Sequence, residues 1–318
     1  MGLNKVAKLI LEKNMELKRE EKILVITDAN KVEIGNAFFE EGRKIAAEAR
    51  LLEIPVSDRH GAEPPAECAE IMPKYDVIMI PITQSLSWTA ARDKATKAGA
   101  RIASMPGITK EIMMRSINAD YNAMKKRTEK LIKIMNNGRT VKVASGKGTN
   151  IEMSIDGVKA LGGDCGIYHS PGSWGNLPTG ECFLAPKEGT ANGRIVVDGS
   201  MGGIGKVDQN IIIEVKRGMA VNIEGGESAD RLRKNLKAVG SDKAYNIAEL
   251  GIGTNDKARI TGTILEDEKV LGTAHIAFGT NKSMGGTVEA GIHVDGIFFE
   301  PTIFVDGNKI IDKGKLLI

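Results

Sequence analysis

The first third of the chain alternates short apolar runs with amphipathic stretches. The apolar runs predict four strands, over Ile23–Ile26, Leu51–Ile54, Val77–Ile80 and Arg101–Ser104. The stretches of mixed polarity predict helices over Glu33–Arg50, Trp88–Ala98, Thr109–Met114 and Tyr121–Met135. Strands that alternate with helices are typical of a parallel sheet. The pattern therefore predicts an α/β domain with a Rossmann-like parallel sheet.

The pattern changes at Asn136-Asn137-Gly138, where a helix stop is followed by a turn. Beyond this point the chain reads mostly as strands and glycine turns, with one predicted helix over Ser228–Val239. The predicted strands are Val141–Ala144, Gly193–Val197, Asn210–Val215, Met219–Ile223, Ala258–Ile264 and Gly291–Phe299. We therefore expect two domains, an α/β domain over residues 1–138 and an α+β domain with a mostly antiparallel sheet over residues 139–318.

Composition and charge narrow the class of protein. The 318 residues are 42% hydrophobic and 27% charged, as in ordinary soluble globular proteins, and the net charge of +3 is spread too thinly for a nucleic-acid surface. The start of the chain, Met1 to Lys22, reads as an amphipathic helix rather than a signal peptide, and no apolar stretch approaches the ~20 residues of a membrane span. Three cysteines without a CxxC spacing fit a reducing compartment. We expect a cytoplasmic protein with no nucleic-acid or membrane partner.

Two common kinds of active site are absent from the sequence. The first predicted strand runs into Thr27-Asp28-Ala29-Asn30, which lacks the glycines that let a backbone approach a pyrophosphate. No G-x-S-x-G motif occurs, and no cysteine has a histidine in a recognised family spacing. A dinucleotide site and an acyl-enzyme hydrolase are therefore disfavoured.

Histidine is scarce, and two of the four histidines lie in the last quarter of the second domain. The segment around His293 and Asp295 alternates as a strand does, so these two side chains are expected on the same face. An imidazole beside a carboxylate forms half of a site for zinc, cobalt, manganese or iron. The alternative is a hydrogen-bonded pair without a metal.

Three further ionisable residues lie in segments that are otherwise apolar or rich in glycine. They are Glu181, Glu249 and His275. Acids are rarely buried without a partner, so such positions are candidates for a site. Each also has a simpler interpretation: Glu181 as a solvated turn residue, Glu249 as a helix or loop cap, and His275 as a satisfied core histidine.

Four segments in order, NLPTGECFLAP, NIAELGIGTN, LGTAHIAFG and GIHVDGIF, resemble the metalloaminopeptidases of the aminopeptidase T family, peptidase family M29, which are leucyl aminopeptidase-like. The resemblance implies a homodimer that releases N-terminal residues from peptides through two divalent metal ions, zinc or cobalt, with manganese or iron also possible. The implied ligands are Glu181, Glu249, His275, His293 and Asp295. Glu181 or Glu249 would also accept a proton from the attacking water.

The sequence departs from this family at one position. Where the family has a tyrosine at the site, this chain has Lys282, whose ammonium group two cations would repel. Lys282 is therefore expected to point away, or its loop to take another course. Tyr245, which precedes Glu249 by four residues, is a possible catalytic substitute for the missing tyrosine.

Two other functions remain open. His275, His293 and Asp295 also match the composition of two histidines and one carboxylate found in non-heme iron oxygenases, and a ring-cleaving dihydroxypyridine dioxygenase resembles the same peptidase family. We favour the peptidase because Glu181 and Glu249 are both present. The third possibility is a non-catalytic metal-binding protein in which Lys282 blocks one metal position.

Overall fold

The computed structural model describes residues 2–162 and 165–318, which form two compact units. The described residues up to Tyr121, together with Gly166–Thr179, make the first unit. The described residues from Asn122 to Cys165, together with Gly180–Ile318, make the second. These units differ from the expected division at Gly138 in two places: helix α6 (Tyr121–Asn137) lies almost wholly in the second unit, and a later segment returns to the first.

Bonds from α6 explain its place in the second unit. The guanidinium of Arg127 donates to the carbonyl oxygen of Thr254 at 2.9 Å, and the hydroxyl oxygens of Thr128 and Thr254 lie 2.8 Å apart in a buried position. A helix stop in the sequence therefore does not mark the boundary, because tertiary bonds decide which unit a helix joins.

The first unit is built on a five-stranded parallel sheet in the order β2-β1-β3-β4-β7. Its strands are β1 (Lys22–Thr27), β2 (Glu48–Glu53), β3 (Val77–Ile82), β4 (Arg101–Pro106) and β7 (Trp174–Asn176). Its helices are α1 (Leu3–Leu9), the π-helix η1 (Ile10–Asn14), α2 (Val32–Ile45), α3 (Ala66–Ile71), the 3-10 helix η2 (Met72–Lys74), α4 (Ala90–Lys97) and α5 (Lys110–Ser116). The predicted α/β fold is confirmed, with a fifth strand supplied by the returning segment.

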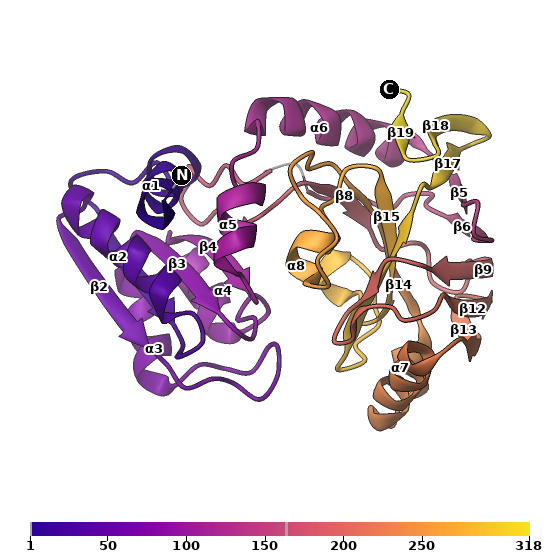
Figure 1. Cartoon of the computed structure of the whole chain (residues 1–318), viewed down its shortest axis with the longest axis horizontal. Helices are drawn as coiled ribbons and strands as arrows, with labels where there is room; N and C mark the ends of the chain where they lie inside the picture. Colours follow the sequence, from indigo (N-terminus) through magenta and orange to yellow (C-terminus); the bar gives the residue numbers. More distant parts are fainter. Residues whose placement is uncertain (1, 163–164) are drawn as a thin grey trace. The chain divides into compact units, whose positions relative to one another are not determined.

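Helices cover both faces of this sheet. Leu24 and Ile26 belong to the same hydrophobic cluster as Cys68 of α3. Ile23 points to the opposite face, where it packs on Gly42 of α2; a Cβ at that glycine would lie 3.1 Å from the Ile23 side chain. Figure 1 shows α2 beside α1 and the strands of this sheet. Burial on both faces explains why these strands read as continuous apolar runs.

The second unit contains two antiparallel sheets, an eight-stranded sheet in the order β13-β12-β9-β6-β5-β17-β18-β19 and a six-stranded sheet in the order β11-β10-β16-β15-β14-β8. The eight-stranded sheet consists of β5 (Thr140–Ala144), β6 (Asn150–Ser154), β9 (Asn192–Val197), β12 (Ile211–Lys216), β13 (Met219–Glu224), β17 (Thr302–Val305), β18 (Asn308–Asp312) and β19 (Lys315–Leu316). The six-stranded sheet consists of β8 (Glu181–Leu184), β10 (Ser200–Met201), β11 (Gly205–Lys206), β14 (Ile247–Gly253), β15 (Thr273–Gly279) and β16 (His293–Phe299). The expected α+β fold with antiparallel sheets is confirmed.

One hydrophobic core joins the two sheets of this unit. It includes Val143 and Ile195 of the eight-stranded sheet together with Leu250, Ile276 and Phe298 of the six-stranded sheet. The remaining helices of the unit are α7 (Glu227–Ala238), α8 (Ile264–Asp267) and the 3-10 helices η3 (Asp242–Tyr245) and η4 (Lys282–Met284). Because one face of the six-stranded sheet supplies this core, its other face is left for polar side chains.

The predicted strand over Ala258–Ile264 is wrong. Most of that segment is a loop, and α8 begins at its last residue. The Asp267 carboxylate accepts hydrogen bonds from the backbone nitrogens of Thr261 at 2.7 Å and Gly262 at 2.9 Å. The backbone nitrogens of this segment thus donate their hydrogen bonds to a buried carboxylate instead of to a neighbouring strand. The predicted N-terminal helix is also shorter than expected and ends at Asn14.

No helix within residues 2–162 and 165–318 has both the length and the apolar character of a membrane span. Cys68, Cys165 and Cys182 are all buried, and no disulfide joins any two of them.

A buried ion pair in the first unit joins Arg101 to Glu21. Two guanidinium nitrogens donate to the two carboxylate oxygens, each at 2.8 Å, and the side chains are 6% and 14% exposed. Burial raises the pKa of Glu21, but the bonds from Arg101 outweigh this and the pKa is lowered. Glu21→Gln leaves the guanidinium without a counter-charge, so we expect the free energy of unfolding of this unit to fall by about 3 kcal/mol.

Urea unfolding followed by tryptophan fluorescence measures this change, because both tryptophans, Trp88 and Trp174, lie in the first unit. Glu67→Gln is the control: it removes an exposed pair with Arg50 and should cost less than about 1 kcal/mol. Because folding lowers the pKa of Glu21, its contribution is present above the unfolded pKa and is lost as the pH falls through the folded one. Equal losses in the two variants would contradict the assignment.

Candidate metal centre

The five residues expected as ligands lie on four neighbouring strands of the six-stranded sheet. Glu181 is the first residue of β8, Glu249 lies in β14, His275 lies in β15, and β16 carries His293 and Asp295. Figure 1 shows β8, β14 and β15 side by side. Paired residues share a face of a sheet, and side chains alternate along each strand. The observed register therefore places all five side chains on one face, opposite the hydrophobic core.

Glycines make room for these side chains. In the register of the sheet, Gly253 lies opposite Glu181, and Gly251 lies opposite His275. A Cβ on Gly251 would overlap the imidazole ring of His275. The Nε2 end of the ring thus occupies the space that a side chain at position 251 would fill.

Glu249 lies between the two histidines. Its Oε1 is 3.3 Å from His275 Nε2, and its Oε2 is 3.1 Å from His293 Nε2. The residue is only 6% exposed. Burial raises the pKa of this carboxyl, but hydrogen bonds from the two histidines outweigh it and hold the pKa below its usual range. Glu249 is therefore an anion that contacts both imidazoles.

His293 is oriented by a hydrogen bond from Nδ1, the ring nitrogen that does not face Glu249. The bond from Nδ1 to the carbonyl oxygen of Thr280 is 2.8 Å long, and a carbonyl can only accept, so Nδ1 carries the hydrogen. Nε2 is then directed at Glu249 and at Asp295, whose Oδ1 lies 3.4 Å away. Metal-binding histidines are held in the same way by an outer partner. The side chain is 32% exposed, so the cluster is reached from solvent at this residue.

His275 is fully buried, and its Nε2 also lies 3.4 Å from Glu181 Oε2. Burial lowers the pKa of this imidazole, but the Glu249 bond and the Glu181 charge outweigh it and raise the pKa to about 9. Asp295 and Glu249 likewise raise the pKa of His293 against the effect of burial. These shifts favour the protonated form of both rings, and because a metal binds neutral imidazole, its binding would release these protons.

Three groups of side chains could each hold a cation. In each group, one ligand atom from each residue lies within 4.8 Å of the ligand atoms of the others. The first group is Glu181, Glu249 and His275, the second is Glu249, His293 and Asp295, and the third is Glu268, His275 and Asp295. Within the described residues, Glu181 Oε2 is buried without a hydrogen-bond partner, as a ligand atom would be. Imidazole and carboxylate suit iron, manganese, zinc or cobalt. The residues present therefore fit a divalent metal.

Two members of this cluster, Glu268 and Lys269, were missed by the sequence analysis. Lys269 Nζ donates to Glu181 and, at 2.5 Å, to Glu268 Oε1. Burial raises the pKa of Glu268 to about 8. Both residues belong to a charged run that looks like a solvated turn. One feature of the sequence could have marked this run as buried: apolar Ile264-Leu265 precede it and apolar Val270-Leu271 follow it, just before the strand that carries His275.

The two other residues singled out from the sequence lie elsewhere. Tyr245, expected as a catalytic substitute, packs against the hydrophobic core, and no hydrogen bond in the described part of the chain joins it to the five ligand candidates. Lys282 pairs with Glu289 at 2.7 Å, and both side chains are more than 60% exposed. Lys282 thus points to solvent, which leaves no reason to assign it a blocking role.

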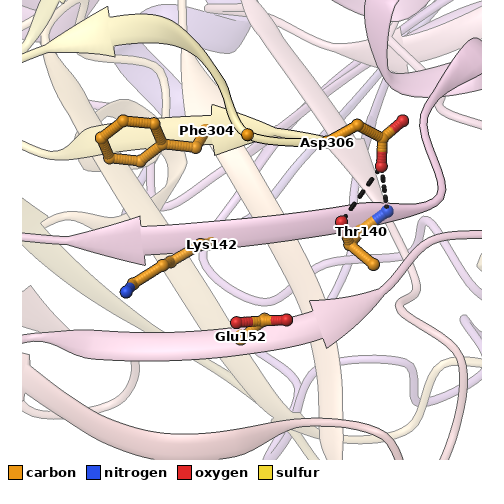
Figure 2. Close-up of a pocket in the computed structure, with 6 residues that line it drawn as sticks. Thr140, Lys142, Glu152, Phe304 and Asp306 are labelled. Atoms are coloured by element: carbon orange, nitrogen blue, oxygen red, sulfur yellow. Dashed lines mark hydrogen bonds between the residues drawn. The ribbon is translucent and has the colours of Figure 1, made fainter.

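A surface hollow on the eight-stranded sheet contains none of the ligand candidates. It is lined by Thr140, Lys142, Glu152, Phe304, Asp306 and Gly307 (Figure 2). The Asp306 carboxylate accepts bonds from the backbone nitrogen and hydroxyl of Thr140 at 2.8 and 3.0 Å, which holds the paired ends of β5 and β17. These polar groups serve local structure, so the cluster on the six-stranded sheet remains the candidate site.

The sequence from residue 10 to residue 318 matches the model of the family NicX, 2,5-dihydroxypyridine 5,6-dioxygenase. The protein belongs to this family. The curated 2,5-dihydroxypyridine 5,6-dioxygenase of Pseudomonas putida KT2440 is 23% identical over 252 residues, which are 74% of this chain and 69% of that protein.

Two solved structures share the fold. The 2,5-dihydroxypyridine dioxygenase of Pseudomonas putida KT2440 superposes with a TM-score of 0.85 at 19% identity, over 99% of this chain and 96% of the other. AmpT from Thermus thermophilus, an M29 aminopeptidase, superposes with a TM-score of 0.75 at 16% identity, over 99% of both chains. The fold expected from the aminopeptidase resemblance is therefore shared.

The expected function, an M29 aminopeptidase acting on peptides, is wrong, because the family match identifies a dioxygenase family. The four motifs contain the ligand candidates and the small residues around them, and such a face suits a metal in either enzyme class. The presence of Glu181 and Glu249 therefore does not favour a peptidase, contrary to our interpretation of the sequence. A metal cofactor agrees with the family and with the cluster, whereas two ions and the choice of zinc or cobalt stay predictions.

Gly251→Ala tests whether the space left by the missing side chain of Gly251 positions the imidazole of His275. The added methyl group would push the imidazole out of place, and we expect the affinity for manganese or cobalt to fall at least about 10-fold. Isothermal titration calorimetry measures the affinity, with circular dichroism as a check of folding. Gly146→Ala is the control, because nothing lies within 4 Å of its Cβ position. Unchanged affinity in the Gly251 variant would refute this role.

Proposed function

We propose that this protein is a dioxygenase that opens the ring of a dihydroxypyridine and uses iron(II) as its metal. The match to the dioxygenase family over residues 10–318 carries the proposal. The donor set supports it, because two histidines with carboxylates are the ligands that non-heme iron oxygenases use.

The residues that would hold the iron are His275, His293, Glu249 and Asp295, which lie in the overlapping groups described above. A bound iron(II) supplies the redox chemistry by which dioxygen reacts with an electron-rich aromatic ring. The protein supplies the position of these ligands. The bond from His293 to Thr280 keeps Nε2 aimed at the carboxylates, and the six-stranded sheet fixes the spacing of the rest.

Glu181 is the residue we assign to proton transfer from a substrate hydroxyl. Its Oε2 has no hydrogen-bond partner among the described residues and lies beside His275, on the same face as the ligand candidates. Burial raises the pKa of this carboxyl despite the nearby Lys269, which makes it a stronger proton acceptor than an exposed glutamate. Glu249, with its lowered pKa, is the better permanent anion.

Oxygen consumption tests this function directly. The protein is first loaded with iron(II) in the absence of air and then transferred to air-saturated buffer. It should consume oxygen when 2,5-dihydroxypyridine is added, and one molecule of the aromatic ring, followed by its absorbance, should be lost for each molecule of oxygen consumed. His293→Ala removes an imidazole from the cluster, so bound iron and the rate should both fall by about 100-fold or more.

His60→Ala is the matched control, because this exposed histidine accepts a backbone hydrogen bond from Ser85 in the first unit. Its iron content and rate should equal those of the unaltered protein. Hydrolysis of a leucyl chromogenic amide without any oxygen uptake from dihydroxypyridines would defeat the proposal.

A further inference from the structure

The loop over residues 280–292 joins β15 to β16, and the residue after it is His293. The carbonyl of Thr280 accepts the hydrogen on Nδ1 of His293, so the place of this carbonyl decides where Nε2 points. Thr280 is itself held by the far end of the loop. Its backbone nitrogen donates to the carbonyl of Ile292 at 2.8 Å, and its hydroxyl oxygen accepts from the nitrogen of Ala290 at 3.0 Å. The orientation of His293 therefore depends on how the loop is closed.

A buried asparagine closes the loop from inside. Asn281 is fully buried, its Oδ1 accepts from the backbone nitrogen of Val288 at 2.8 Å, and its Nδ2 donates to Glu188 Oε1 at 3.0 Å. The glycine at position 286 makes room for this amide, because a Cβ there would overlap the Asn281 side chain. Since Asn281 follows Thr280 directly, bonds that fix the asparagine also restrict the threonine carbonyl.

A carboxylate from outside the loop completes the closure. Glu188 follows β8, and its Oε1 accepts from the backbone nitrogen of Thr287 at 2.6 Å as well as from Asn281. Its Oε2 accepts from the Thr287 hydroxyl, also at 2.6 Å. The bonds from Thr287 outweigh the effect of burial and lower the pKa of Glu188. One exposed carboxylate thus ties the two sides of the loop together.

His293 needs such support more than His275 does. His275 is fully buried within β15, which pairs with a strand on each side. His293 is the first residue of β16, and its side chain is 32% exposed, so neighbouring side chains restrict it less. A side chain that is free to rotate loses this freedom when it binds a metal, and the loss weakens binding. A ring that is held in place beforehand avoids this cost.

We propose that Glu188 and Asn281 are positioning residues of the metal centre, which act by closing the loop that orients His293. The inference rests on the metal centre of the proposed function and adds residues that lie outside it. Among the described residues, no hydrogen bond or ion pair joins Glu188 or Asn281 to a ligand candidate. Apart from the charge of Glu188, their effect on a metal therefore passes through the loop.

The test measures manganese(II) binding by isothermal titration calorimetry in three variants, with circular dichroism as a check of folding. Glu188→Ala opens the loop closure, so we expect the affinity to fall about 10-fold. Glu188→Gln keeps an oxygen for Asn281 and the Thr287 nitrogen, and its amide can donate to the Thr287 hydroxyl, so its affinity should stay within about 3-fold of the unaltered protein. Glu289→Ala is the matched control, because it removes an exposed acid of the same loop that pairs with Lys282, and its affinity should also stay within about 3-fold.

Nuclear magnetic resonance of the metal-free protein reports on the His293 ring itself. With nitrogen-15 in the histidines only four imidazoles give signals, and those of His293 are identified by their loss in His293→Ala. In Glu188→Ala the hydrogen on Nδ1 of His293 should exchange with water at least about 10-fold faster, because the bond to Thr280 opens more often. The other two variants should keep the slow exchange.

The inference requires both changes in Glu188→Ala. Unaltered manganese affinity or unaltered exchange in this variant would overturn it. An equal fall in affinity in Glu188→Gln or Glu289→Ala would also overturn it, since loss of charge would then explain the result. If Glu188→Ala folds poorly, Thr287→Val removes one exposed hydroxyl bond and should change both quantities in the same direction by a smaller amount; no change in either would count against the inference.

Failure of the proposed function is distinguishable from failure of this inference. The function fails when iron-loaded protein takes up no oxygen with dihydroxypyridine, whereas manganese binding and imidazole exchange need no turnover. A loss of affinity together with faster exchange in Glu188→Ala would support the positioning role even then.

Discussion

The constraint on which this structure depends is the burial of several carboxylates on one face of one sheet. Glu181, Glu249 and Asp295 lose most of their hydration there, and such a loss is tolerated only when positive charge replaces the water. Lys269 supplies such charge, and the carboxylates in turn raise the pKa of the two imidazoles, which favours their charged form. The apolar opposite face, the glycines and the anchored loop before β15 all serve to keep these groups in register.

Much of the fold follows from hydrophobic periodicity, for a physical reason. Strands such as Val77–Ile82 are buried on both faces, so they stand out as unbroken apolar runs. The same rule fails for Ala258–Ile264, whose apolar residues flank a loop tied to buried acids. It also misplaces the end of the helix at Arg50, because that helix stops at Ile45 and β2 begins at Glu48. Hydrophobic periodicity does not show where hydrogen bonds to distant parts of the chain determine the local structure.

The site was only partly predictable. Glu181 and Glu249 are recognisable because acids are unusual in apolar and glycine-rich segments, and His293 with Asp295 because they alternate along a strand. Lys269 was missed because a charged run has the same local pattern whether it lies in water or beneath a loop. The reaction was misjudged because motifs that contain ligands and their small neighbours describe a metal-binding face, and such a face does not by itself identify the class of enzyme.

The close approach of the His275 imidazole to Gly251 also bears on how this family can diverge. A side chain at the glycine and the histidine ring compete for the same space, so neither position can drift alone. A descendant that acquires even a methyl group there has to abandon the imidazole or tilt its strand. The two positions should therefore be inherited together, and their joint loss in a related sequence would mark a protein that has kept the scaffold and given up its metal.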